Sequence, residues 1–417
     1  MGRSKLIVIA VIFALVVLVI GRSDAEAVPA FARKFGVSCA ACHTTPPRLN
    51  ETGYRFRAAG FRWPTGIGIK ESAEYFDILD HMSARIQVSY SASRSKTGST
   101  EASASNELKL AAFELYPFIG SWGKYFSADT KVTFGPSGAP VIENTYLKAD
   151  LGDEKRFFAA RIGIFHPYDG YGASDGPATI SRPFFQTTPA NHSGSTFFTT
   201  WGFDQLGAEV GVDYGRTSVR AALLNGLVLS EEDGKFKASA AQGGALTARS
   251  PAPSSNTPDF QLFVNHVLNP EGGGLSLYYY HGNLFLPIVG SGTFFLNKFD
   301  RVAVYGGYPV AKRLHLLGGI QRGRDHLATG ETFASEGAFA EAVVPINQLT
   351  AAGVRYDWFD PARDSVNNES KGITAYVNAW FYKQFRVVAE YQHKNTKRGS
   401  APEQRDDAFQ VRFVYIK

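Results

Sequence analysis

The sequence predicts an all-β protein: an outer-membrane antiparallel β-barrel of about 16 strands, preceded by a small, mainly α-helical N-terminal segment. First, aromatic residues make up 13% of the 417 residues and glycine occurs 42 times, which is typical of strands joined by turns. Second, apolar and polar residues alternate with period two over most of the chain beyond residue 82. Third, residues 83–417 divided among about 16 strands give about 21 residues per strand and connection, the spacing of a membrane barrel.

The first 27 residues have the pattern of an export signal. Arg3 and Lys5 precede an apolar run from Leu6 to Ile20, and the small-residue site Ala25-Glu26-Ala27 follows it. The alternative is an uncleaved membrane anchor, but the run has 15 residues, whereas a spanning helix needs roughly 20. We therefore predict a signal peptide at residues 1–27, cleaved before Val28, and export to the outer membrane of a Gram-negative bacterium.

The charge balance of the chain is modest. The formal net charge is +5, and it falls to +4 without residues 1–27, because that segment carries three basic and two acidic residues. A charge this small on so long a chain indicates no nucleic-acid partner.

The only two cysteines stand in the pattern Cys39-Ala40-Ala41-Cys42-His43. Two thiols at this spacing each add to a vinyl group of one porphyrin, and the adjoining histidine supplies a ring nitrogen to the iron. The alternative is a structural disulfide, which an oxidising compartment permits. We predict one covalent haem c, attached to Cys39 and Cys42, with His43 as an iron ligand.

A helix is predicted after this motif, over residues 48–60. Leu49, Gly53, Phe56 and Gly60 fall on one helical face, with Pro47 suited to the first turn and Gly60 to the end. We assign residues 28–82 to a monohaem cytochrome segment whose core would be mostly the haem itself.

Residues 83–417 are assigned to the barrel. In the run from Ala208 to Tyr214, for example, Glu209 and Asp213 share one face while Val210, Val212 and Tyr214 share the other. A large secreted β-sandwich or propeller is the alternative. Each strand boundary is defined to roughly 2–4 residues, and a count of 14 or 18 strands is also compatible with the pattern. The predicted strands are 84–94, 106–117, 123–134, 142–151, 155–165, 204–214, 216–228, 258–268, 273–282, 294–305, 313–322, 333–345, 350–359, 370–381, 385–395 and 405–416.

Two predicted connections are long. Residues 166–203 form either an external loop or one folded into the lumen. Residues 229–257, rich in Ala, Ser and Gly, are predicted to be a flexible external loop. Such barrels place their long loops outside and their short turns on the periplasmic side.

The second iron ligand has several candidates. Met82, the only methionine besides the initiator, would raise the reduction potential of a haem. His81 lies beside it, His166 and His192 lie in the long connection, and a haem without a protein ligand at this position is a further alternative. For His43, the carbonyl of Pro46 or Pro47 is a candidate acceptor of the second ring N–H.

Basic residues are frequent in residues 28–82. We expect some of them to pair with haem propionates or with inward-facing acids such as Glu209, Asp213 and Glu390, because inward charges need partners. The basic residues are Arg33, Lys34, Arg48, Arg55, Arg57 and Arg62.

The run from Ala27 to His43, AVPAFARKFGVSCAACH, followed by Pro47, Leu49, Gly53 and Phe56, resembles the fused monohaem cytochrome–porins, the Cyc2-type outer-membrane iron oxidases. The resemblance implies a short cytochrome segment that plugs a barrel of about 16 strands. It also implies electron transfer from extracellular Fe(II) to a periplasmic carrier. This chain has Lys34-Phe35 where iron-oxidising members usually carry Gln-Thr, which leaves the donor open.

Three functions follow as hypotheses. The first is electron transfer through the haem, from an extracellular donor such as Fe(II) to a periplasmic c-type cytochrome or other carrier, which would make the chain an Fe(II):cytochrome oxidoreductase. The second is a solute-selective porin whose haem segment is a structural plug or sensor. The third is a wholly soluble periplasmic cytochrome.

Overall fold

The structure of the protein is a computed structural model. It describes residues 30–63, 81–134, 140–165, 178–187, 189–192, 195–198, 205–225, 227–232, 235–240, 258–287, 294–311, 313–326, 330–363, 368–381 and 384–417. The signal peptide predicted at residues 1–27 lies outside the described residues.

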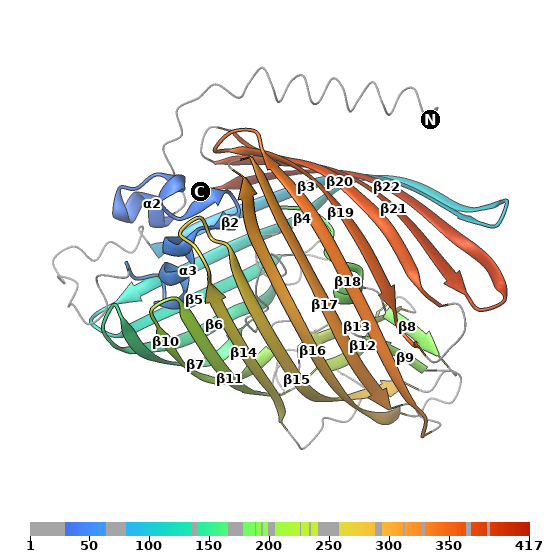
Figure 1. Ribbon diagram of the computed structural model, residues 1–417, viewed down its shortest axis with the longest axis horizontal. Coiled ribbons are helices and arrows are strands. Elements are labelled where there is room, and N and C mark those ends of the chain that lie inside the picture. The colour runs from blue at the N-terminus through green and yellow to red at the C-terminus, as the bar shows by residue number, and fades with distance from the viewer. Residues whose placement is uncertain are drawn as a thin grey trace.

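Sixteen strands close into one antiparallel barrel (Figure 1). Each pairs with the next barrel strand along the chain, and the last pairs with the first, so the described barrel has no open edge. The predicted fold class and all sixteen predicted strands are confirmed. The barrel strands are β3 (Ser83–Thr97), β4 (Thr100–Trp122), β5 (Phe126–Phe134), β6 (Pro140–Gly152), β7 (Arg156–Phe165), β10 (Gln205–Tyr214), β11 (Thr217–Leu224), β14 (Asp259–Val267), β15 (Gly274–Pro287), β16 (Phe294–Ala311), β17 (Leu314–His326), β18 (Thr332–Pro345), β19 (Thr350–Asp360), β20 (Ser370–Phe381), β21 (Phe385–Arg398) and β22 (Ala401–Ile416).

The barrel is apolar outside and charged inside. In β10, Val210, Val212 and Tyr214 are 49%, 45% and 68% exposed, whereas Glu209 and Asp213 are 4% and 5% exposed. The same exposed apolar surface continues around the wall through Leu108, Leu147, Ile162, Leu223, Leu277, Val302, Ile320, Val354, Ile373 and Phe413. A soluble protein would bury its apolar side chains, whereas a barrel with lipid outside and a polar lumen inside exposes them on its outer surface. The exposed apolar surface contradicts the soluble sandwich, propeller and soluble cytochrome alternatives and supports a place in an outer membrane.

The two ends of the barrel differ in their connections. At one end, called the short-turn end here, residues 123–125, 153–155, 215–216 and 268–273 join consecutive strands. At the opposite, long-loop end, residues 166–204 join β7 to β10, and residues 225–258 join β11 to β14. Because barrels of this kind put short turns in the periplasm, the short-turn end is the expected periplasmic end.

Residues 30–63, the N-terminal segment, pack on the short-turn end, where Figure 1 shows them in blue. The main-chain N–H of Glu51 donates to the carbonyl of Pro270 at 3.0 Å, and Arg55 Nη2 donates to the carbonyl of Glu154 at 2.7 Å. Both acceptors lie in turns between barrel strands. The segment consists of α2 (Ala30–Phe35), a 3-10 turn η1 (Cys39–Ala41), β1 (His43–Thr45), β2 (Arg48–Leu49) and α3 (Glu51–Ala58).

The helix predicted over residues 48–60 begins later than expected. Arg48 and Leu49 form β2, which pairs with β1, and α3 starts only after Asn50. Pro47 therefore lies in the β1–β2 turn and not in the first helical turn. The predicted end is confirmed, because Gly60 follows the helix with φ +64°, a conformation that favours glycine. Among the described helices, none has the length and apolar character needed to cross a membrane.

Part of the first long connection folds into the lumen. Residues 178–187, the lumen segment, end in the short helix α4 (Phe184–Thr187). The ring of Phe185 is fully buried, and its centroid lies 6.1 Å from those of the inward residues Tyr305 and Phe339. Of the two predicted alternatives for residues 166–203, this part takes the one inside the barrel.

The second long connection is more ordered than predicted. Residues 229–257 were expected to be a flexible loop, but β12 (Leu227–Glu232) and β13 (Lys235–Ala240) pair as a hairpin. The preceding strand, predicted over 216–228, ends as β11 at Leu224. The hairpin satisfies the backbone hydrogen-bonding groups of residues that the sequence had assigned to a loop.

Candidate functional site

The two cysteines share one tight turn of the backbone. Cys39 opens η1, and the N–H of Cys42 donates to the carbonyl of Cys39 at 3.2 Å. Neither is disulfide-bonded and both are partly exposed, so the disulfide alternative is not realised here. Burial, followed by the charge of Cys39, raises the pKa of the Cys42 thiol.

His43 is held through one ring nitrogen. Its Nδ1 lies 3.2 Å from the carbonyl oxygen of Pro47, an acceptor that assigns the ring proton to Nδ1. Nε2 is then the nitrogen that can ligate a metal, and this is the arrangement in which a backbone acceptor orients a ligating histidine. Of the two carbonyls considered from the sequence, Pro47 is the acceptor, while Pro46 accepts from Asn378 Nδ2 at 2.8 Å. Burial lowers the pKa of His43 and thereby favours its neutral form.

Helix α3 is fixed to the cysteine motif by its capping residue. Asn50 Nδ2 donates to the carbonyls of Ala40 and Ala41, each at 3.2 Å, and Asn50 Oδ1 accepts from the N–H of Gly53 at 2.9 Å. A Cβ on Gly53 would lie 2.2 Å from the carbonyl oxygen of Cys42. Any residue other than glycine at position 53 would therefore keep the helix farther from the cysteine motif.

An aromatic cluster packs beside the motif. The ring of Phe31 lies 5.0 Å from Phe56 and 4.9 Å from Phe61, and Phe35 lies 5.9 Å from Trp63. The predicted face of Leu49, Gly53 and Phe56 thus packs partly on other aromatic side chains. The segment thus has aromatic contacts of its own, and the expectation that a haem would form most of its core stays a prediction.

The predicted distal ligands lie in different environments. His81 is 2% exposed, its ring stacks on Phe118 with centroids 4.7 Å apart, and its Nε2 lies 3.5 Å from Lys34 Nζ. Met82, directly before β3, is 42% exposed. His166 lies outside the described residues, and His192 ends β8 (Pro189–His192), where its side chain is not described. The distal ligand stays a prediction, with Met82 and His81 as candidates.

A buried ion cluster fastens the end of α3 to the wall. Asp150 accepts from Lys148 and lies 3.8 Å from Arg62 Nη1, and these three side chains are 0%, 2% and 2% exposed. Lys148 also donates to the carbonyl of Ala58, the last residue of α3. Arg62 further donates to the carbonyl of Phe126 at 2.9 Å. Burial of three charges is tolerable only because they are paired and hydrogen-bonded to one another.

More contacts surround this cluster at the short-turn end. Arg216 Nη2 lies 2.8 Å from Glu51 Oε2, and Thr44 Oγ1 donates to the carbonyl of Glu271 at 2.6 Å. Arg48 Nη1 lies 3.1 Å from His315 Nδ1. The N-terminal segment is thus bonded to β6, β17, the β10–β11 turn and the β14–β15 turn, which places the cysteine motif at the mouth of the lumen.

The predicted pairing of basic residues with inward acids is right in kind and wrong in its members. Arg62 pairs with an inward acid, but that acid is Asp150. Glu209 instead accepts from Arg161 at 2.7 Å, and Asp213 accepts from Arg220, so the wall supplies both partners. The side chain of Arg33 lies outside the described set.

The third acid, Glu390, holds the lumen segment. It accepts from the N–H groups of Ile180 at 2.6 Å and Ser181 at 3.1 Å. Two strands away, on β19, Arg355 donates to Thr179 Oγ1 and Ser181 Oγ, each at 3.0 Å. These bonds tie the lumen segment to β19 and β21 and narrow the lumen there.

Sequence reasoning missed Asn50, Asp150 and Asn378. Asn50 carried a signal, since Asn directly before a helix is a preferred cap, but the helix start was placed three residues too early. Asp150 and Asn378 lie in strands with several inward polar residues, and the sequence pattern does not distinguish these residues from one another. Among the described residues, no group of three or more His, Cys, Asp or Glu side chains could hold a metal ion.

No protein-family model matches this chain, and no curated protein matches its sequence. Solved structures do match it. The anion-selective porin from Comamonas acidovorans aligns with a TM-score of 0.56 at 11% identity, over 81% of this chain and 99% of that one. The barrel has the fold of outer-membrane porins. OmpT of Vibrio cholerae aligns with a TM-score of 0.53 at 10% identity, over 81% and 97% of the two chains. The channel DcaP of Acinetobacter baumannii aligns with a TM-score of 0.51 at 10% identity, over 84% and 100%.

Proposed function

We propose that this chain is an outer-membrane electron-transfer protein in which a porin-like barrel carries one covalent haem c. Cys39 and Cys42 would attach the haem and His43 would ligate its iron. The observation that carries the proposal is the hydrogen bond of His43 Nδ1 to the carbonyl of Pro47, which leaves Nε2 for ligation beside two cysteines that form no disulfide. A disulfide-bonded or structural pair of cysteines needs no such histidine.

The resemblance to the fused cytochrome–porins supports the same proposal. Met82 and His81 remain the proposed candidates for the second axial position, and a cleaved signal peptide at residues 1–27 remains the proposed export device. Residues 28–82 would act as the cytochrome segment and residues 83–417 as the barrel.

A haem bound there would supply a reversible one-electron carrier. The residues of the chain would hold it at the short-turn mouth, through Asn50, Arg62 and the Asp150 cluster. The barrel would bridge a layer about 30 Å thick that electrons do not otherwise cross efficiently. The partners would be an extracellular donor, Fe(II) being one candidate, and a periplasmic c-type cytochrome or other carrier at the short-turn end.

The test uses full-length Cys39→Ala and Ala41→Ser in outer-membrane vesicles. Cys39→Ala should lose covalent haem, measured as haem absorbance per barrel after denaturation, and should lose reduction by added Fe(II). Ala41→Ser, which keeps both thiols and the histidine, should retain both. Covalent haem at the wild-type level in Cys39→Ala would disprove the attachment, whereas intact haem without reduction by Fe(II) would reject that donor alone.

The comparisons taken alone favour a second candidate, a solute-selective porin whose N-terminal segment acts as a plug or sensor. The specific observation is that the similar structures are porins and channels, one of them described as anion-selective. Swelling of liposomes that contain the full chain separates the candidates. Rapid swelling in small solutes would support the porin, and swelling no faster than in protein-free liposomes would count against it.

A further inference from the structure

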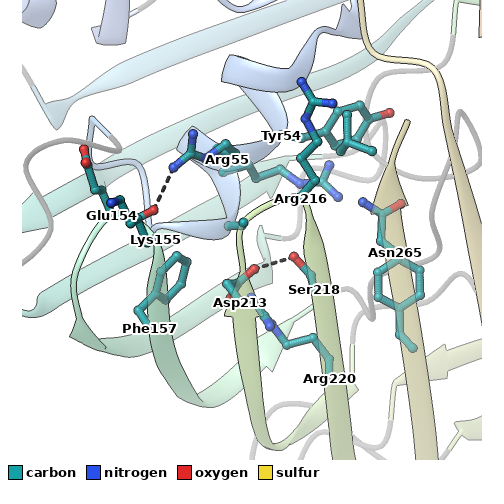
Figure 2. Close-up of a pocket in the computed structure, with 15 residues that line it drawn as sticks. Tyr54, Arg55, Glu154, Lys155, Phe157, Asp213, Arg216, Ser218, Arg220 and Asn265 are labelled. Atoms are coloured by element: carbon teal, nitrogen blue, oxygen red, sulfur yellow. Dashed lines mark hydrogen bonds and ion pairs between the residues drawn. The ribbon is translucent and has the colours of Figure 1, made fainter. Parts of the chain in front are cut away.

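A cavity lies between α3 and the barrel wall, on the side of the helix away from the cysteine motif. Figure 2 shows Tyr54 and Arg55 of α3 above it, Lys155 and Phe157 to one side, and Asp213 and Arg220 below. Its volume of about 40 Å³ is room for roughly three water molecules. A small tetrahedral oxyanion needs a space of this kind.

Basic side chains dominate the lining. Arg55, Arg57, Lys155, Arg216 and Arg220 carry positive charge, against the two acids Glu154 and Asp213. Of these acids, Asp213 already accepts from Arg220 and Ser218, and the bond that Arg55 makes to Glu154 goes to its carbonyl oxygen at 2.7 Å. Glu51, which is not part of the lining, pairs with Arg216, so five basic groups face three acidic ones, and the remaining positive charge attracts an anion.

The cavity faces the lumen side of the wall. Asp213 and Arg220 are 5% and 2% exposed, whereas the alternate residues Val212 and Val219 are 45% and 39% exposed on the outer surface. Phe263, which also lines the cavity, is 4% exposed. A ligand would thus come from the aqueous phase at the short-turn end and not from the lipid.

The basic residues of the lining come from separate elements. α3 supplies Arg55 and Arg57, the β6–β7 turn supplies Lys155, and the β10–β11 turn supplies Arg216. An oxyanion between them would accept charge-assisted hydrogen bonds from both the N-terminal segment and the barrel. Anion binding would therefore fasten the segment to its seat.

We infer that this cavity is a binding site for a small oxyanion of the phosphate class. The inference does not depend on the haem, because the cavity and the cysteine motif lie on different faces of α3. Bound phosphate bridges α3 and the two turns, and it resists release of the N-terminal segment from the mouth.

The experiment uses the full chain in detergent with inorganic phosphate as the probe and chloride at equal ionic strength as the reference. Calorimetry measures the phosphate affinity, and limited trypsin digestion measures how fast the N-terminal segment is released. Wild type should bind phosphate and be digested more slowly in phosphate than in chloride. The double variant Arg57→Gln/Lys155→Gln keeps the bond of Arg55 to Glu154 and that of Arg216 to Glu51. Its phosphate affinity should fall about tenfold or more.

Lys124→Gln is the matched control, since Lys124 is an exposed residue of another turn at the same end and does not line the cavity. Its phosphate affinity should equal that of wild type. Two results would overturn the inference: protection by phosphate no greater than by chloride, or equal loss of affinity in Lys124→Gln. Heat-modified gel mobility of the barrel confirms that each variant is folded.

Discussion

Asp150→Asn is the substitution that most directly tests how the N-terminal segment is held. Asp150 is paired with both Lys148 and Arg62, and all three side chains are at most 2% exposed. Asparagine keeps the shape of the side chain and removes its charge, which leaves two cations buried side by side.

The size of the effect follows from the distances. At 3.8 Å, the attraction between Arg62 and Asp150 is about 4 kcal/mol for an effective dielectric constant of about 20. Removal of one partner of a buried ion pair costs about 3–5 kcal/mol in measured cases. Since about 1.4 kcal/mol is a factor of ten, the population of released segment should rise by at least about a hundredfold.

Limited trypsin digestion of the full chain in detergent measures that population. The barrel should survive while the N-terminal segment is cut much faster than in wild type, and gel mobility without heating reports that the barrel is intact. Glu154→Gln is the control, because its exposed side chain lies at the same end and its carbonyl bond to Arg55 is unaffected. Adding Lys148→Met to Asp150→Asn removes one uncompensated cation and should restore part of the protection. Equal digestion of Asp150→Asn and wild type would refute the proposed anchor.

Three further outcomes are expected. Gly53→Ala should reduce haem incorporation, measured as absorbance per barrel, because a Cβ would lie 2.2 Å from the Cys42 carbonyl; an unchanged yield would show that α3 need not approach so closely. Arg355→Gln removes four hydrogen bonds to the lumen segment, so liposomes with this variant should swell faster than those with wild type. Arg322 is exposed on the same barrel, and Arg322→Gln should leave the swelling rate unchanged. Hydrogen bonding to Lys397 lowers the pKa of Glu369 from 4.5 to about 2, so its contribution to stability is present above pH 4.5 and disappears as the pH falls through about 2. The difference in melting temperature between wild type and Glu369→Gln should shrink over that interval, and a constant difference would contradict the assignment.

The sequence predicted the strands well because each spanning strand repeats one local pattern. In β10, alternate residues face lipid or lumen, so hydrophobicity with period two marks the strand without reference to its neighbours. The cysteine motif is equally local, since it is recognised from the spacing of residues 39 to 43. The start of α3 was placed too early, because Arg48 and Leu49 are drawn into pairing with β1.

The sequence by itself thus determined the barrel, its sixteen strands and the position of the cysteine motif, and it predicts His43 as an iron ligand. Only the tertiary structure decided which groups hold that motif in place. Pro46 accepts from Asn378, which is 332 residues away in sequence, and Arg62 meets Asp150 rather than Glu209 or Glu390. Many inward polar residues are alike in a local pattern. Their partners are fixed by strand register and by where the N-terminal segment enters the mouth, and both depend on the closed barrel as a whole.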